Sequence, residues 1–190
     1  TPASPSIQSK PVSHPAIRAS HGASTSKFTA EISAKLGGVF GVLPAASESV
    51  VFGGRLRRKL WSIEIEGGRY RTVSLPLAGG EMQSGLWLGA ASACRHRGRV
   101  GICGVASTGM MVSEGRGLGV DLQARTPYAA LGARASLEYP LGDRLALRTS
   151  FDLSGTLLRA RLHVSGTPMG EWVAPPVTTG IGMSISGRLW

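Results

Sequence analysis

Apolar and polar residues alternate along several segments of this chain. The clearest is Arg144–Ser154, where leucine or phenylalanine occupies most odd positions and charged or hydroxyl residues occupy most even positions. Successive side chains point to opposite faces of a β-strand. The segment therefore predicts a strand with one apolar face and one charged face.

Seven further segments show the same alternation, which gives eight predicted strands in all. They are Phe28–Leu43, Ser49–Arg57, Trp61–Glu66, Met82–Arg95, Gly101–Val112, Tyr128–Tyr139 and Ile181–Leu189. In the first of these, Val42 is assigned to the apolar face together with Phe40. The fourth and fifth are the weakest, because glycine, alanine and serine occur on both of their faces.

Short and long connections alternate between these strands. The short ones are Arg58–Leu60, Arg95–Arg99 and Pro140–Asp143, and the longer ones are Leu43–Glu48, Tyr70–Gly80, Ser113–Pro127 and Gly155–Thr178. Two-faced strands in even number, with tight turns on the side of both termini and longer loops on the other, are typical of bacterial outer-membrane barrels. Within the last connection, Leu158–Val164 is predicted to form a bulge and an extension of the preceding strand.

The predicted fold class is all-β. We expect an eight-stranded antiparallel up-and-down transmembrane β-barrel with a polar lumen over residues 27–190, preceded by a flexible tail or linker over residues 1–26. No apolar run approaches the roughly 20 residues of a membrane-spanning helix. Thr1 opens a polar stretch without a signal peptide, so we expect the processed or trimmed form of an exported protein.

The net charge is +10 in 190 residues. The basic residues are scattered along the strands, apart from a short cluster at Arg55–Lys59, and no nucleic-acid-binding motif accompanies them. We therefore expect no nucleic-acid partner, and we expect the rims of the barrel to meet anionic lipid headgroups.

The polar strand faces carry charges that would point into the lumen, six basic and five acidic. These are Lys35, Arg55, Arg57, Arg134, Arg148 and Arg188, and Glu31, Glu64, Glu66, Glu138 and Asp152. An eight-stranded barrel is just wide enough inside for side chains. Paired charges are therefore predicted to close the lumen, with Arg134, Glu138, Arg148 and Asp152 on one inner wall.

Cys94 and Cys103 flank a predicted turn and would face each other across a hairpin. A disulfide and two free buried thiols both fit this placement. Two cysteines and scattered histidines make a poor metal site, and no glycine-rich motif lies between a strand and a helix, so no metal or cofactor is expected.

The pattern, the loop asymmetry and the position of the last strand resemble the small outer-membrane β-barrels of Gram-negative bacteria, of the OmpA-transmembrane-domain type. The resemblance covers Lys27–Trp190 and implies a monomer in outer-membrane lipid, with termini in the periplasm and a surface-loop ligand that the sequence does not identify. It also implies insertion by the barrel assembly machinery. The position that such barrels fill with an aromatic in phase with the apolar face is here Leu189, with Trp190 following it.

Three function classes follow. The first is a non-enzymatic envelope element, anchor or surface-loop binding platform. The second is a lipid-modifying enzyme, because His163 and Ser165 resemble the His/Ser pair of outer-membrane lipid A deacylases, with Glu171 or Asp152 as the acid. The third is a soluble lipocalin-like carrier of an apolar ligand, in which the apolar faces would point inward.

Overall fold

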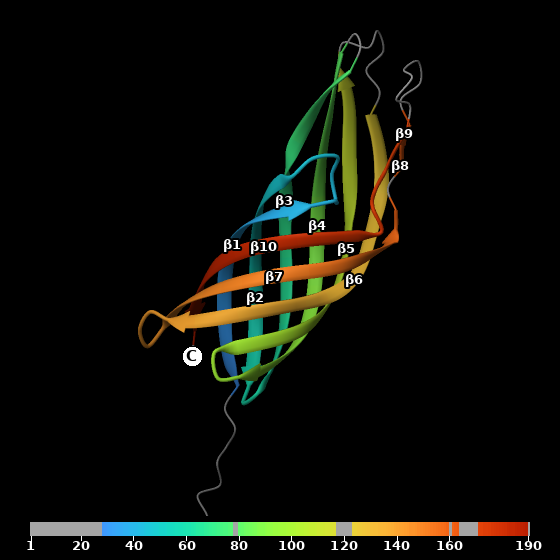
Figure 1. Cartoon of the computed structure of the whole chain (residues 1–190). Helices are drawn as coiled ribbons and strands as arrows, with labels where there is room; N and C mark the ends of the chain where they lie inside the picture. Colours follow the sequence, from blue (N-terminus) through green and yellow to red (C-terminus); the bar gives the residue numbers. More distant parts are fainter. Residues whose placement is uncertain (1–27, 78–79, 117–122, 160, 164–170, 190) are drawn as a thin grey trace, which may run out of the picture.

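The computed structural model describes residues 28–77, 80–116, 123–159, 161–163 and 171–189. Eight antiparallel strands close into one barrel in the order β1-β10-β7-β6-β5-β4-β3-β2 (Figure 1). Their bounds are β1 Thr29–Phe40, β2 Ser47–Arg58, β3 Trp61–Leu77, β4 Gly80–Arg97, β5 Val100–Arg116, β6 Gln123–Pro140, β7 Leu145–Leu158 and β10 Val177–Arg188. The predicted fold class is confirmed, whereas the predicted tail lies outside the described residues.

The apolar faces of the strands point outward and the charged faces point inward. Leu36, Phe52 and Ile65 on the outer surface are 65%, 64% and 69% exposed, whereas Arg55 and Glu64 on inward positions are 5% and 3% exposed. This is the opposite of the arrangement that the soluble-carrier hypothesis requires. No helix that could cross a membrane occurs among the described residues.

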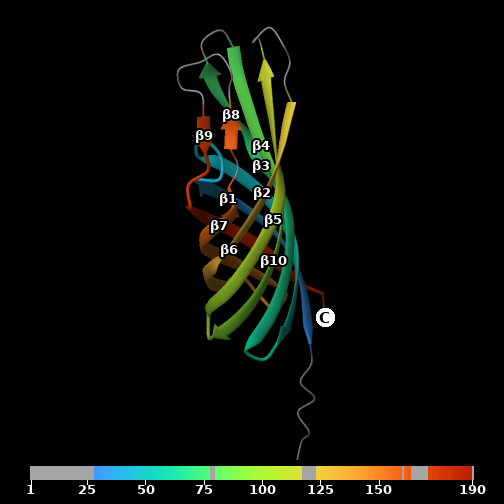
Figure 2. The same cartoon turned by 90° about the vertical axis from the view of Figure 1, so that its right-hand side faces the viewer.

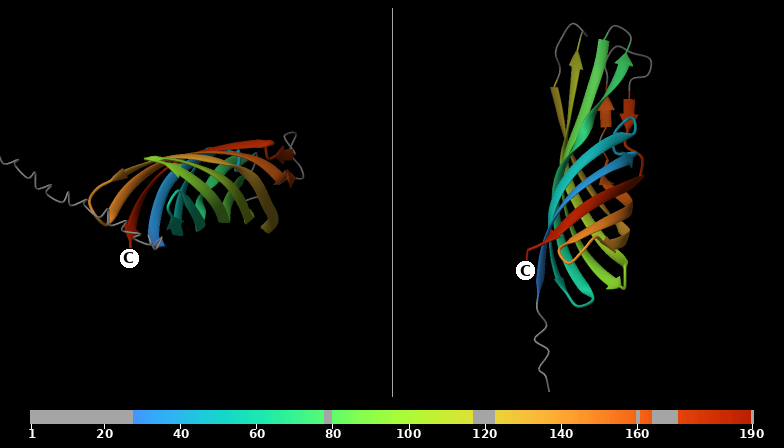
Figure 3. Two further views of the ribbon diagram at one scale, coloured as in Figure 1. Left: turned by 90° about the horizontal axis from the view of Figure 1, so that it is seen from below. Right: turned by 90° about the vertical axis from the view of Figure 1, so that its left-hand side faces the viewer.

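The two ends of the barrel differ. The β2–β3, β4–β5 and β6–β7 turns lie at one end, where the start of β1 pairs with the end of β10 through Glu31 and Arg188 (Figure 3). At the other end, strands β3 to β6, of 17 or 18 residues each, continue beyond the rest of the barrel (Figures 1 and 2). We call these the short-turn end and the long-strand end.

Two predicted loops are therefore wrong over most of their length. Tyr70–Gly80 continues strand β3 to Leu77 and contains the first residue of β4, and much of Ser113–Pro127 belongs to β5 and β6. A bulge between Tyr70 and Val73 shifts the register of β3 against β4. The bulge interrupts the alternation, because an extra residue exchanges the inner and outer faces of the strand.

The end of the first predicted strand is also corrected. Gly41 has a positive φ of 86° and turns the chain after β1. Val42 is consequently 5% exposed inside the barrel mouth instead of on the apolar outer face. A positive φ costs glycine little, because it has no Cβ.

The segment after β7 forms no extension of that strand within the described residues. The register of β7 against β6 does shift between Thr156 and Leu158, just before the segment in which the bulge was predicted. However, Arg161–His163 (β8) pairs with Glu171–Val173 (β9) in a separate two-stranded sheet. The hairpin register of β8 is thus set by β9 and not by the barrel wall.

Candidate functional site

The barrel interior gathers charged side chains from five strands. Ten of the eleven predicted lumen charges are joined there by ion pairs, and we call them the charge network: Glu31, Lys35, Arg55, Arg57, Glu64, Glu66, Arg134, Glu138, Arg148 and Asp152. Arg188 is not among them, because it is exposed and donates a hydrogen bond to the backbone carbonyl of Asp143 at 3.4 Å. The network therefore holds five basic and five acidic groups, which neutralise one another.

Glu64 on β3 is the centre of the network. Its Oε1 accepts from Arg55 Nε at 2.5 Å and from Arg148 Nη1, and its Oε2 lies 3.5 Å from Arg134 Nη1. Ser92 on β4 also donates to Oε2, at 3.4 Å. One carboxylate thus contacts three buried guanidinium groups that come from β2, β6 and β7.

Two of these arginines bridge several strands each. Arg55 Nη1 lies 3.0 Å from Glu31 and 2.8 Å from Glu138. Arg134 binds both carboxylate oxygens of Glu66 at 2.8 Å and contacts Asp152 at 2.5 Å. Such bidentate, charge-assisted bonds fix the orientation of both partners.

The pairing on the β6–β7 wall follows the strand register only in part. Arg134 lies opposite Asp152 and binds it, but Arg148, opposite Glu138, reaches across the lumen to Glu64 on β3. Glu138 in turn pairs with arginines of β2. Sequence alternation finds the faces of such residues but not their partners across a lumen.

Nearer the short-turn end, Cys94 and Cys103 form a disulfide between β4 and β5. They are directly paired in the strand register and fully buried, at 0% and 2% exposure. His96, two residues further along β4, shares a 2.8 Å hydrogen bond with Ser62. The described residues include no group of three or more metal-binding side chains.

The other half of the interior is mainly filled by apolar side chains, beside a few buried hydroxyl residues such as Ser84 and Ser113. Residues from four strands and from the chain segments before β2 and before β10 form a buried cluster, which we call the apolar plug: Val39, Val42, Leu43, Met82, Leu86, Met111, Tyr128, Ala130 and Ala174. The sequence contained a signal for it, since Leu86 and Leu88 occupy inward positions of β4 on either side of Trp87. The sequence predicts paired charges as the filling of the lumen, and the plug corrects that expectation for the long-strand half.

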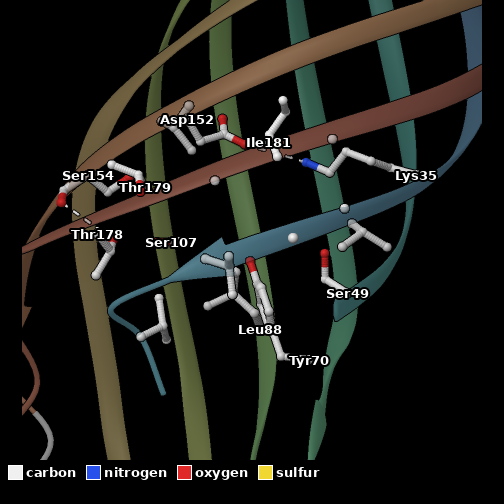
Figure 4. Close-up of a pocket in the computed structure, with 18 of the residues that line it drawn as sticks. Lys35, Ser49, Tyr70, Leu88, Ser107, Asp152, Ser154, Thr178, Thr179 and Ile181 are labelled. Atoms are coloured by element: carbon white, nitrogen blue, oxygen red, sulfur yellow. Dashed lines mark hydrogen bonds and ion pairs between the residues drawn. The ribbon is translucent and has the colours of Figure 1, made fainter. Parts of the chain in front are cut away.

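A cavity of about 70 Å³ lies between the plug and the charge network. Lys35, Asp152 and Tyr70 are among its lining residues, and Figure 4 shows the amine of Lys35 pointing toward Asp152. Their ion pair measures 3.8 Å. A cavity of this size, lined by both polar and apolar side chains, has room for a few water molecules.

The structure shows no geometry that supports the proposed catalytic pair of His163 and Ser165. His163 lies in β8, where its backbone pairs with Glu171, and Ser165 lies outside the described residues. Asp152, the other suggested acid, is engaged by Arg134 and Lys35 inside the barrel. That engagement leaves Asp152 occupied by two cations.

In sequence, the chain matches no protein-family profile and no curated protein. In structure, it is similar to Neisserial surface protein A, with a TM-score of 0.52, 13% identity and coverage of 84% of this chain and 96% of that one. It is also similar to Ail, the attachment invasion locus protein of Yersinia pestis (TM-score 0.54, 11% identity, coverage 85% and 96%). A major outer membrane protein from Thermus thermophilus has a TM-score of 0.52 and 12% identity, with coverage of 84% and 99%.

At these identities the similarity concerns the fold. The chain has the fold of the small eight-stranded outer-membrane β-barrels. The resemblance predicted from its alternating strands is confirmed at that level.

Proposed function

We propose that this protein is a non-enzymatic outer-membrane β-barrel with a closed lumen, which serves as an envelope structural element, an anchor or a platform for surface binding. One observation carries the proposal: an exposed apolar belt surrounds an interior in which charges are paired. A soluble protein rarely leaves an apolar surface of this extent uncovered. A bilayer would cover it, and the paired charges and the apolar plug would prevent solute flow.

The aromatic residues support the membrane placement. Phe28, Trp61 and Tyr139 are exposed near the short-turn end, and Trp87 is exposed toward the long-strand end. Tyr and Trp favour membrane–water interfaces. We place the short-turn end and both barrel termini in the periplasm, because tight turns lie on that side of outer-membrane barrels.

The long-strand end would then project from the cell surface. Strands β3 to β6 present two extended hairpins there, which suit a binding platform better than a pore. Ail, which has a similar fold, has been crystallised with the heparin analogue sucrose octasulfate. The β1–β10 pairing leaves no free edge on the barrel, which fits a monomer in lipid, inserted by the barrel assembly machinery.

Refolding tests the proposal. The protein should fold only with detergent or lipid and should migrate faster in gels before heating than after. In planar bilayers it should give no steady conductance. Stable, monodisperse folding in plain buffer would contradict membrane residence, and a steady ion current would contradict the closed lumen.

Epitope tags test the orientation. A tag inserted after Gly98, in the β4–β5 turn, should be reached by antibody only after the outer membrane is permeabilised. A tag inserted after Gly119, between β5 and β6, should be reached in intact cells. The reverse result would invert the topology while leaving the barrel itself intact.

A further inference from the structure

Exposed basic side chains surround the short-turn end of the barrel. We call the seven of them the basic rim: Arg58, Lys59, Arg95, Arg97, Arg99, Arg144 and Arg188. They come from all three tight turns and from the last strand. Backbone hydrogen bonds join neighbouring parts of this rim, from Arg188 N to Arg144 O at 2.8 Å and from Glu138 N to Arg99 O at 2.9 Å. The rim therefore extends around the circumference of the barrel.

Three of these arginines lie over outward-facing aromatic rings. The guanidinium carbons of Arg58, Arg95 and Arg99 are 5.1, 5.8 and 5.9 Å from the ring centres of Phe28, Trp61 and Tyr139. Cation–π contacts of this kind hold the charge against the ring face. The charges are thereby fixed at the edge of the apolar belt, where a bilayer would place its phosphates.

The two ends of the barrel differ in charge balance. Near the basic rim, Asp143 is the exposed acidic side chain among the described residues, while Glu138 faces inward and binds Arg55 and Arg57. At the long-strand end, acidic Glu48, Glu81 and Glu114 accompany the basic residues. Glu48 forms an exposed ion pair with Arg71 at 3.0 Å. The positive excess is thus concentrated at the short-turn end.

We propose that the basic rim binds anionic phospholipid headgroups in the leaflet at the short-turn end. This inference rests on the proposed membrane residence and adds the chemical class of the lipid. The phosphates of a surrounding leaflet form a ring, which matches charges spread around a barrel. A nucleic acid or other linear polyanion would instead need the charges aligned along one face. Basic residues close to an anionic surface each add to lipid attraction.

Quenching of single tryptophans by brominated lipids tests the proposal locally. One variant keeps Trp61 at the basic rim (W87F/W172F/W190F), and the other keeps Trp87 at the opposite end (W61F/W172F/W190F). Each is folded into vesicles of phosphatidylcholine and phosphatidylglycerol in which one lipid at a time is brominated high on its acyl chains. We expect phosphatidylglycerol to be enriched roughly threefold to tenfold at Trp61, and about equally represented at Trp87.

Charge removal provides the matched comparison. Adding R58Q, R95Q and R99Q to the Trp61 variant should abolish most of the enrichment, as should high salt. Adding R69Q, R71Q and R125Q, which removes the same charge from the long-strand end, should leave it unchanged. Circular dichroism and gel mobility confirm that each variant is folded.

Several results would overturn the inference. Equal quenching by both lipids at Trp61 would do so, and so would an enrichment that survives the R58Q/R95Q/R99Q changes. Binding of a single-stranded oligonucleotide without lipid enrichment would assign the rim to a different polyanion. If neither brominated lipid quenches either tryptophan, the barrel is not in the bilayer, and the proposed membrane function itself fails.

Discussion

The two halves of the lumen are filled in different ways. Toward the short-turn end the interior is occupied by the charge network, in which Glu64 alone contacts Arg55, Arg134 and Arg148. Toward the long-strand end it is occupied by the apolar plug, in which Leu86 and Met111 are 1% and 2% exposed. Both arrangements fill the barrel, but the stability of the first depends on the balance of charges and that of the second on close packing.

A single substitution has different consequences for stability in the two halves of the lumen. Removing one member of the charge network leaves an unbalanced charge buried among its former partners, and this costs more than the contact itself contributed. Removing an apolar side chain from the plug leaves a cavity, whose cost depends on how far the neighbours can relax. The charged half should therefore respond as a unit, and the apolar half residue by residue.

The largest effect is expected for Glu64→Gln. The side chain keeps its size, but three arginines lose their shared carboxylate, so the free energy of unfolding should fall by about 3–5 kcal/mol. Urea titration followed by tryptophan fluorescence in a neutral detergent measures it. Glu48→Gln is the control, because the side chains of Glu48 and its partner Arg71 are 76% and 75% exposed. A loss no larger than the control's would mean that water reaches the network freely.

Leu86→Ala tests the apolar half. Truncating this buried leucine should cost about 2–4 kcal/mol by leaving a cavity in the plug. Leu36→Ala, at a 65% exposed outer position, is the control in the same titration. Conductance measurements on the same variant sharpen the comparison, since a barrel closed mainly by the charge network should remain closed. An open, steady current would assign the closure to the plug.

The disulfide should contribute less. Cys94 and Cys103 are nine residues apart, and cross-linking so short a loop removes limited entropy from the unfolded chain, so replacing both by serine should cost about 2 kcal/mol. Thermal unfolding of the double variant, compared with the parent under oxidising and reducing conditions, measures the effect. If the serine variant were as stable as the oxidised parent, the cross-link would have no role in holding β4 against β5.

The smallest effect is expected for Arg188→Gln. Its exposed guanidinium donates to the Asp143 carbonyl, so in a neutral detergent stability should change by less than about 0.5 kcal/mol. Arg148→Gln, made in parallel, should cost several times more because Arg148 is 5% exposed and binds Glu64. Equal losses would show that the network includes Arg188 after all.

Sequence alternation predicted most of the fold because its physical cause is simple. Where a strand has an apolar outer face and paired charges on its inner face, as at Leu147 and Arg148, apolar and charged residues alternate along the sequence. The prediction was weakest where that contrast disappears and wrong where the alternation changes phase. Around Trp87 both faces are apolar, because the lumen there holds the plug. After Tyr70 a bulge changes the phase.

The sequence predicted which charged residues line the lumen but not which of them form ion pairs with one another. Alternation placed Arg134, Arg148 and Glu64 on inner faces, and the structure brings them together. Which carboxylate each arginine binds depends on the shear of the closed barrel, that is, on the stagger between its strands. A local sequence pattern does not predict this stagger. Arg188 occupies a position that alternation assigns to the inner face, but it lies at the rim. Alternation gives no information about where a residue lies along the barrel axis.

The seam between β1 and β10 has a consequence for folding. Each of β1 to β6 pairs with the next strand along the chain, whereas this ladder joins Glu31 to Arg188 near opposite ends of the described barrel sequence. Contacts of such high sequence separation carry the largest loop-closure entropy and form slowly. Until the seam forms, Lys35 on β1 cannot be held between Glu66 and Asp152. The ion pair between Lys35 and Asp152 is therefore completed only when the last strand arrives, whereas pairs between neighbouring strands, such as Arg55 with Glu64, need no closed cylinder.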